Sequence, residues 1–432
     1  STLLTMVTSF NECCNIISAS ECEKIAINSQ SQRTIAIRTY KITKIPGHLG
    51  FLGEYFRLEI VVEEDQTQWS EYYFLKSLPI ADKKQRAMMK KLGFFQKEGR
   101  IYSEILAKFR SVGNQKYRKW HPECYYTRDD LIVLEDLTLR HGYRMVHFQK
   151  PLEQAHIYLV LQAIARMHAA SLNYEMNHLN GRRLDDVHSE VLFETTVSHQ
   201  NSWFLAGLSA IKAVALNETR FCREPDKKKI IEEQLDAKLD RVFEVIKPTD
   251  QFQNVLVHRD IWHNNLMFRF EQDPVTGSSN WDRPDACVLV DFQICRYLPP
   301  VIDFLQVLFL TTRRSHRDQH FQHYLQFYHN SLASELGRFE LDADQILSWD
   351  QLERSLQHYM ILAHIFSGIY LQVTSLPEHL LDELHRNDPS LYNQYCNVNR
   401  DEFVRKCLRE DDFYREIMTE CVEEMLEYMF EF

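Results

Sequence analysis

The sequence HRDIWHNN, residues 258–265, constrains this chain more than any other stretch. It is a polar run between two short apolar runs, VLV before it and LMF after it. This arrangement predicts a polar loop held between two strands. Within the loop, His258, Asp260 and Asn265 follow the pattern H-x-D-x-x-x-x-N. Loops positioned by a rigid scaffold commonly carry chemistry, so the stretch is a candidate site.

A second aspartate, Asp291, closes the apolar segment VLVDF further along the chain. Phosphoryl transfer from ATP uses a carboxylate that orients the acceptor hydroxyl and takes its proton, and further oxygen ligands that hold Mg²⁺. Mg²⁺ prefers hard oxygen ligands such as carboxylates and amide oxygens. The two motifs together predict Asp260 as the catalytic base and Asn265 and Asp291 as metal ligands.

A lysine in an apolar strand supplies the next part. Lys76 lies in YYFLKSL on the same face as Tyr72 and Phe74, and an inward-facing charge needs a partner. Glu98 falls on the apolar stripe of the following predicted helix, whereas Glu104 is rotated away from that stripe. We therefore predict a Lys76–Glu98 pair that positions the α- and β-phosphates, as in kinases.

The remaining nucleotide contacts are predicted from backbone positions. Gly47, Gly50 and Gly53 lie between two predicted strands, where glycines let backbone N–H groups approach phosphates. A plain hairpin turn explains their G-x-x-G-x-x-G spacing nearly as well. We expect Gly50 and Gly53 to contact the nucleotide. In LEDL, we expect the backbone of Glu135 and Leu137 to meet the adenine edge.

The order of predicted elements gives the fold class. Strands are predicted at 34–45, 55–64, 71–79 and 130–137, and a helical stretch at 82–109. Beyond residue 137 the pattern is mainly helical, with strands at 266–270 and 287–292 besides the short run before the polar loop. This order predicts an α+β, bilobal fold, with a small antiparallel-sheet N-terminal lobe carrying one main helix and a large, mostly helical C-terminal lobe.

Two domains follow from this order. We place a nucleotide-binding lobe at residues 1–137 and a catalytic and substrate-binding lobe at residues 138–432. A helical segment at about 173–250 separates RMHAAS from HRD, where protein kinases have a short link. We expect this insertion to wall a pocket for a small acceptor rather than for a protein.

Composition excludes several other classes of function. The net charge of −11 argues against general nucleic-acid binding. No apolar run approaches the roughly 20 residues that a membrane-spanning helix needs. The N-terminal stretch lacks a basic region and does not resemble a signal peptide. The 10 cysteines form no CxxC pair, which predicts free thiols in a reducing, cytoplasmic location. The oligomeric state is not indicated.

Six segments together resemble the ecdysteroid kinase-like (CHK kinase-like) family of arthropods, which is grouped with the choline and aminoglycoside kinases. The resemblance implies that the bilobal fold is the protein-kinase-like fold. The six segments occur in the family's order: FLKSLP (74–79), FQKEGRIYSEIL (95–106), LEDL (134–137), RMHAAS (166–171), HRDIWHNNLMF (258–268) and VDFQICRYLPPVIDFLQVL (290–308). HRDIWHNN combined with VDFQ is the most specific feature. One departure lies in the glycine turn, where Phe51 and Leu52 stand in place of small polar residues.

The resemblance implies roles for individual residues. It implies that Asp260 is catalytic, that Asn265 and Asp291 bind metal, and that Asp303 braces the catalytic loop from PPVIDF. We expect His258 to brace the same loop. Three histidines on adjacent helical turns, His316, His320 and His323, have a spacing that could bind metal, but we expect a solvated helix face. For His263, contact with phosphate or substrate and a role in shaping the turn are both open.

The resemblance also implies an activity: an ATP- and Mg²⁺-dependent kinase that phosphorylates a hydroxyl of an ecdysteroid, with the C-22 hydroxyl as one candidate, or of a related apolar alcohol. The stretch 358–373 could line a pocket for such a steroid or belong to the core. One alternative keeps the fold and changes the acceptor to choline or an amino alcohol, which would need an acidic and aromatic cage. Another is a catalytically silent pseudokinase that binds small molecules.

Overall fold

The structure is a computed structural model that describes residues 16–30, 35–45, 53–80, 83–146, 150–272, 279–377, 379–380, 395, 397–398 and 400–432. Contacts between Cα atoms divide the chain into two compact units. The first comprises Ser1–Val146 and Asn264–Gln293, and the second His147–His263 and Ile294–Phe432. The functional boundary after Leu137 is a different kind of division and stays a prediction.

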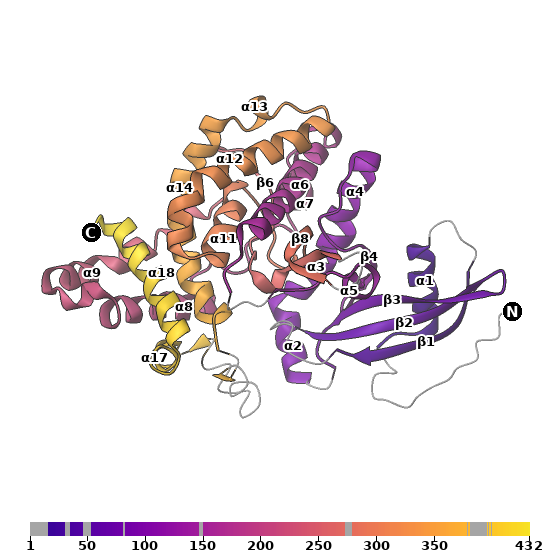
Figure 1. Ribbon diagram of the computed structural model, residues 1–432, viewed down its shortest axis with the longest axis horizontal. Coiled ribbons are helices and arrows are strands. Elements are labelled where there is room, and N and C mark those ends of the chain that lie inside the picture. The colour runs from indigo at the N-terminus through magenta and orange to yellow at the C-terminus, as the bar shows by residue number, and fades with distance from the viewer. Residues whose placement is uncertain are drawn as a thin grey trace. The chain divides into compact units, whose positions relative to one another are not determined.

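The first unit is built on a five-stranded antiparallel sheet in the order β1-β2-β3-β5-β4 (Figure 1). Its strands are β1 (Ala36–Lys44), β2 (Glu54–Glu64), β3 (Thr67–Ser77), β4 (Cys124–Arg128) and β5 (Leu131–Glu135). Four of these strands are predicted from the sequence, and β4 is not. The predicted alternation in β2 is confirmed, because Phe56, Leu58, Ile60 and Val62 are all buried.

The two faces of this sheet have different partners. Helix α1 (Ala19–Ser29) packs its buried Cys22 and Ile25 into a core with the alternating apolar residues of β2. The opposite face carries Tyr55 and Lys76, which are direct partners in the β2–β3 register. One face is therefore a hydrophobic core, and the other presents a charged group beside aromatic rings.

The predicted helical stretch of the first unit is interrupted. It consists of α2 (Lys83–Leu92), α3 (Phe94–Arg100), a π-helical turn (Ile101–Leu106) and α4 (Ala107–Gly113). Gly93, which separates α2 from α3, has a left-handed φ of 73° that a glycine adopts at little cost. The short α5 (Leu137–His141) and a two-stranded hairpin, β7 (Leu266–Gln272) and β8 (Ser279–Leu289), complete the described elements of this unit.

The second unit is mainly helical. Its helices before the polar loop are α6 (Gln154–His178), α7 (Leu184–His188), α8 (Ser202–Asn217), α9 (Pro225–Leu239) and α10 (Val242–Val245). Those after the loop are α11 (Val301–Thr311), α12 (Arg314–Arg338), α13 (Ala343–Ile346), α14 (Trp349–Thr374), α17 (Arg400–Glu410) and α18 (Asp412–Phe430). Strands β6 (Val255–Val257) and β9 (Arg296–Leu298) pair as an antiparallel ribbon. The predicted α+β class, with a sheet-rich and a helical part, is confirmed.

Helix α11 is the centre of the second unit. All of its residues are buried, as expected for a helix that is apolar on every side. Figure 1 shows α11 close to α14, and the buried residues of α14 include most of the stretch 358–373. That stretch is therefore largely core. Among the described residues, no helix combines the length and apolar character needed to cross a membrane.

Close packing between α8 and α14 gives a stability prediction. A Cβ atom on Gly207 would lie 2.7 Å from Cγ2 of Ile369, a stiff β-branched side chain. We expect Gly207→Ala to lower the free energy of unfolding by about 1–3 kcal/mol through overpacking.

The matched control is Gly337→Ala in α12, where an added Cβ meets nothing within 4 Å. This change should raise stability by about 0.5–1 kcal/mol through helix propensity. Thermal unfolding of both variants checks the prediction, and an equal shift of both midpoints in the same direction would contradict it.

Candidate active site

The backbone of the polar loop is held by one buried carboxylate. Asp303 lies in the first turn of α11 and is fully buried. Its Oδ2 accepts the His258 N–H at 2.7 Å, and its Oδ1 accepts the Arg259 N–H at 2.9 Å. The first turn of a helix also favours a negative charge electrostatically. This is the bracing contact that the resemblance implies for Asp303.

Three further side chains extend this support. Gln306, one turn along α11, donates to the Arg259 carbonyl at 2.8 Å and accepts the Ile261 N–H at 3.4 Å. His168 of α6 donates from Nε2 to Asp303 at 3.1 Å, because a carboxylate can only accept, and its Nδ1 then accepts the Tyr328 hydroxyl at 2.8 Å. A hydrogen-bonded frame from α6, α11 and α12 therefore fixes the loop.

Asp260 follows this anchored segment directly. Its N–H donates to Nδ1 of His258 at 3.2 Å, so the His258 side chain contacts the loop backbone. The residue is 7% exposed. Burial raises the pKa of Tyr370 on α14, and the nearby negative charge of Asp260 adds to that rise. Tyr370 is thus a neutral hydroxyl near the predicted base, which the sequence did not single out.

In the first unit, Lys76 lies between two carboxylates. Its Nζ donates to Oε2 of Glu98 at 2.6 Å and to Oδ1 of Asp291 at 3.0 Å. The predicted Lys76–Glu98 pair is therefore present. Glu104, which the helical spacing disfavours, pairs with Arg100 instead.

The charges of this cluster depend on each other. Burial alone would lower the pKa of Lys76, but the charges of Asp291 and Glu98 outweigh burial and raise it. Burial raises the pKa of Glu98; the Lys76 charge opposes that rise and the Asp291 charge adds to it. Lys76 is therefore held as a cation by the two carboxylates together.

The residue after Asp291 locks this arrangement. The Phe292 N–H donates to Glu98, and its buried ring packs edge-on against Tyr102 with centroids 5.3 Å apart. The same ring contacts Trp120 at 5.8 Å and His121 at 6.1 Å. Burial lowers the pKa of His121 to about 4, so this neighbour is neutral.

Asn265 and Asp291 come from adjacent strand ends of the β7–β8 hairpin. Leu266 and Leu289 are register partners, and the Asn265 carbonyl accepts the Val290 N–H at 3.1 Å. Asp291 has a φ of 69°, which turns the chain sharply at the end of β8. One amide oxygen and one carboxylate at this turn are hard donors, and such a set fits Mg²⁺. No group of three or more His, Cys, Asp or Glu side chains with metal-binding geometry occurs in the described part of the chain.

The other predicted nucleotide residues are placed only in part. Gly47, Gly50, Phe51 and Leu52 lie outside the described residues. Gly53 lies against β3, where an added Cβ would be 3.1 Å from the Ser77 carbonyl and 3.7 Å from Cγ of Lys76. A side chain at Gly53 would thus crowd the Ser77 carbonyl, and the φ of 144° at this position is one that residues with a Cβ atom rarely adopt.

The segment after β5 is stabilised by side chains. Glu135 accepts from Lys119 and from Nε2 of His141, and its own N–H donates to the Glu123 carbonyl at 2.8 Å. Asp136 caps α5 by accepting the Leu139 N–H at 2.9 Å. Leu137 is the first residue of α5, and the N–H groups of a helix's first turn have no partner within the helix.

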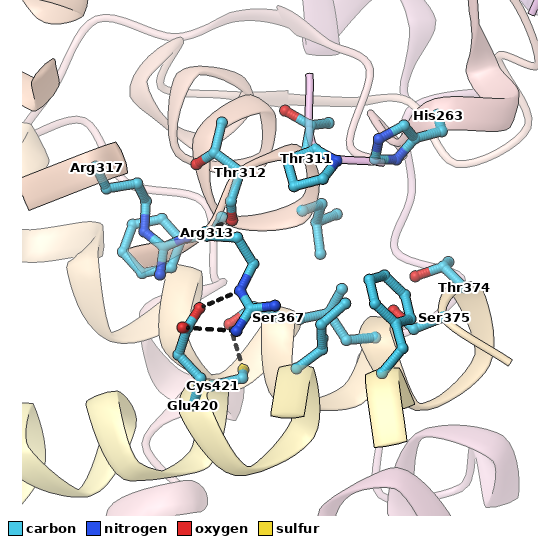
Figure 2. Close-up of a pocket in the computed structure, with 16 residues that line it drawn as sticks. His263, Thr311, Thr312, Arg313, Arg317, Ser367, Thr374, Ser375, Glu420 and Cys421 are labelled. Atoms are coloured by element: carbon cyan, nitrogen blue, oxygen red, sulfur yellow. Dashed lines mark hydrogen bonds and ion pairs between the residues drawn. The ribbon is translucent and has the colours of Figure 1, made fainter. Parts of the chain in front are cut away.

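The second unit contains a small cavity beside the loop (Figure 2). His263 lines it, and its Nε2–H donates to the Lys150 carbonyl at 2.9 Å. Its volume is about 40 Å³, enough for a few waters or a small polar group but not for a steroid body. Arg313 and Glu420 form a two-pronged ion pair on its wall, with both N–O distances 3.0 Å.

Three histidines of α12 make structural contacts. His316 bonds the Tyr324 hydroxyl at 2.7 Å, and His323 bonds the Tyr158 hydroxyl at 2.6 Å. His316 and His320 are half-buried and His323 is exposed, so this face of α12 is partly packed and not fully solvated. The cysteines of the described residues are free thiols: Cys22, Cys124, Cys222, Cys287, Cys295, Cys407 and Cys421.

Comparison with known proteins adds one clear result. A family model described as the ecdysteroid kinase-like family matches residues 49–341 of the chain. None of the curated proteins compared with the chain matches it. Among solved structures, the chain is similar to the ethanolamine kinase of Plasmodium vivax, with 12% identity, a TM-score of 0.38 and coverage of 88% of this chain and 83% of that one. A likeness at that TM-score supports no conclusion about fold or function.

The support of the loop by Asp303 can be tested by stability. In Asp303→Asn, one amide oxygen replaces two carboxylate oxygens, and the new NH₂ faces a backbone donor. An unsatisfied buried donor costs about 1–3 kcal/mol, so the free energy of unfolding should fall by at least that amount.

Denaturant unfolding measures the effect. Asp350→Asn is the matched control, because Asp350 forms an exposed i,i+4 pair with Arg354 and should change stability little. Equal unfolding midpoints for the two variants would show that Asp303 does not hold the loop.

Proposed function

The chain belongs to the ecdysteroid kinase-like family, and on that basis we propose that it transfers the γ-phosphate of ATP to a hydroxyl group of a small molecule, with Mg²⁺ as the metal. Membership supports a small-molecule kinase, a phosphotransferase that acts on alcohols. The observation that carries the proposal furthest is the Lys76 cluster, in which one cation is bonded to Glu98 and to the strand-ending Asp291. This is the combination that phosphoryl transfer requires.

Asp260 is the proposed catalytic base. Its carboxylate would accept a hydrogen bond from the acceptor hydroxyl and take the proton as the oxygen attacks phosphorus. The anchoring of His258 and Arg259 to Asp303 fixes the backbone on its N-terminal side. A preset carboxylate reduces the entropy that must be lost to orient the acceptor.

Lys76 is the proposed phosphate-positioning residue. An ammonium group has three N–H donors, and two of them serve Glu98 and Asp291. The third can donate to a phosphate oxygen while the two carboxylates hold the side chain in place. Gly50 and Gly53 are proposed to bring backbone N–H groups near the phosphates. Gly53 permits close approach because it carries no side chain.

Asn265 and Asp291 are the proposed ligands of Mg²⁺. When bound there, the ion would neutralise phosphate charge. For the base of the nucleotide, the Glu135 N–H already serves Glu123, so the Leu137 N–H at the start of α5 is the proposed donor to the adenine edge.

The acceptor is proposed to be an ecdysteroid or a related apolar alcohol, with the C-22 hydroxyl of an ecdysteroid as one candidate. The family supports this class. We also propose that residues 173–250 form a wall of the acceptor pocket. A cytoplasmic location is a further part of the proposal.

The cavity at His263 offers no cage for choline, but it is also too small for a steroid body, so it does not decide between the two acceptors. A quaternary ammonium needs acidic and aromatic groups that face it. There, Glu420 is neutralised by Arg313, and the Phe309 ring already lies under the Arg317 guanidinium, 4.4 Å from its centroid. The pseudokinase alternative predicts that the small molecule binds but that no phosphoryl group is transferred. The experiments below distinguish it from an active kinase.

Replacing the proposed base tests the function directly. With an ecdysteroid as acceptor, Asp260→Asn should lower kcat on the order of 10²–10⁴-fold, because the amide cannot take the proton. Phosphorylated product is measured by mass spectrometry. Asp318→Asn is the control, because Asp318 is an exposed aspartate that pairs with Arg314 along α12, and it should keep full activity. Full activity in Asp260→Asn would refute the assignment.

The metal assignment gives a separate prediction. Asp291→Asn should raise the Mg²⁺ concentration for half-maximal rate by at least about tenfold, since even loss of an outer-shell partner weakens metal sites 10–100-fold. The control is Asp285→Asn, which removes the partner of Arg269 on the same hairpin. The assignment fails if both variants keep the wild-type Mg²⁺ dependence.

A further inference from the structure

A buried charge cluster lies beside the catalytic loop and is not explained by the chemistry above. Oε2 of Glu194 accepts a hydrogen bond from Nη1 of Arg259 at 2.8 Å. The same oxygen accepts a second hydrogen bond from Nη1 of Arg296. The Arg259 and Arg296 side chains are only 1% and 6% exposed, and that of Glu194 is 21% exposed. One carboxylate therefore serves two buried guanidinium groups.

The other oxygen of Glu194 fixes its own loop. Oε1 accepts the N–H groups of Thr195, Thr196 and Val197 at 3.0, 2.8 and 3.0 Å. Five N–H donors thus surround this carboxylate. Burial raises its pKa, but the two arginines and these backbone donors outweigh burial and hold the pKa at about 2. Glu194 is a permanent anion at any pH near neutrality.

Arg259 connects this cluster to the predicted base. Its φ is 69°, a left-handed conformation that is unfavourable for a residue with a Cβ atom. Its N–H and carbonyl are bound by Asp303 and Gln306 on one side, and its side chain is bound by Glu194 on the other. The next residue is Asp260, so the direction of that carboxylate depends on both anchors.

The charge balance makes Glu194 essential to this arrangement. Without it, two guanidinium groups would be buried close together with no carboxylate between them, which is costly. In kinases whose loops are ordered by phosphorylation, an added phosphate supplies such a bridge between arginines. Here a side chain encoded in the sequence supplies it.

We propose that Glu194, in the segment between α7 and α8, is a positioning residue whose carboxylate sets the catalytic loop permanently in its working conformation, so that activity requires no phosphorylation. This inference rests on the proposed function, because it assigns the benefit to Asp260. It predicts a loss in kcat rather than in nucleotide binding, since the Lys76 cluster belongs to the other unit.

The test compares Glu194→Ala, Glu194→Gln and Glu402→Ala, where Glu402 is an exposed glutamate of α17 in the same unit. Both changes at Glu194 should lower kcat by about 10–100-fold, the effect of a small misplacement, with the KM for ATP unchanged. Added acetate should restore part of kcat in Glu194→Ala, where it can replace the lost carboxylate, but not in Glu194→Gln. Glu402→Ala and phosphatase-treated wild type should keep full activity.

Several results would overturn the proposal: an unchanged kcat in Glu194→Gln, a rise in the KM for ATP in place of a fall in kcat, no acetate rescue in a folded Glu194→Ala, or loss of activity after phosphatase treatment. If Glu194→Ala does not fold, the near-isosteric Glu194→Gln decides by its kcat and KM. Asp260→Asn is assayed in parallel. Retained activity there refutes the proposed function, whereas retained activity only at Glu194 refutes the positioning role.

Discussion

The polar loop of the second unit depends on the hydrogen bonds that its backbone donates to the carboxylate of Asp303. This carboxylate is fully buried, yet each oxygen has a backbone N–H partner in the loop 258–265, and His168 adds a third donor. These hydrogen bonds offset the cost of burying the charged carboxylate. They also fix the backbone of the loop. Arg259 can therefore hold a left-handed backbone conformation. Because the backbone of Arg259 is fixed, the next residue, Asp260, begins at a fixed position. An apolar helix, α11, thus acts as the platform for a polar loop.

A second buried charge organises the first unit in the same manner. Lys76 is held by carboxylates from a helix and from the end of a strand, and the Phe292 N–H ties that strand end to the helix. The sheet, α3 and the β7–β8 hairpin are thereby linked through a single ammonium group. In both units the described polar groups are preorganised by neighbours that do not themselves carry out chemistry, which is how enzymes place reacting groups without reorganisation.

The sequence predicts those features that have a local pattern. Alternation identifies β2, and helical spacing selects Glu98 over Glu104 as the partner of Lys76. Features that depend on distant partners leave no such pattern. Strand β4, CYYTR, has few aliphatic residues and is a strand because it pairs with β5. Glu194 lies in an irregular segment far from Arg259 in sequence. Tyr370 is one of many apolar or aromatic residues in its helix, so its position near Asp260 leaves no pattern in the sequence. The insertion at 173–250 contains 14 acidic residues, and no local pattern in the sequence separates Glu194 from the others.

The central claim is transfer of a phosphoryl group to an acceptor hydroxyl, and following the acceptor's oxygen tests it most directly. Wild-type protein is incubated with ATP, Mg²⁺ and an ecdysteroid carrying ¹⁸O in a hydroxyl, and the product is examined by ³¹P NMR and mass spectrometry. The account predicts a phosphomonoester that retains the label in its bridging oxygen, because the acceptor oxygen attacks phosphorus. Tight binding of the steroid with no phosphoester formed from any hydroxylated acceptor would contradict it and favour a silent binding protein.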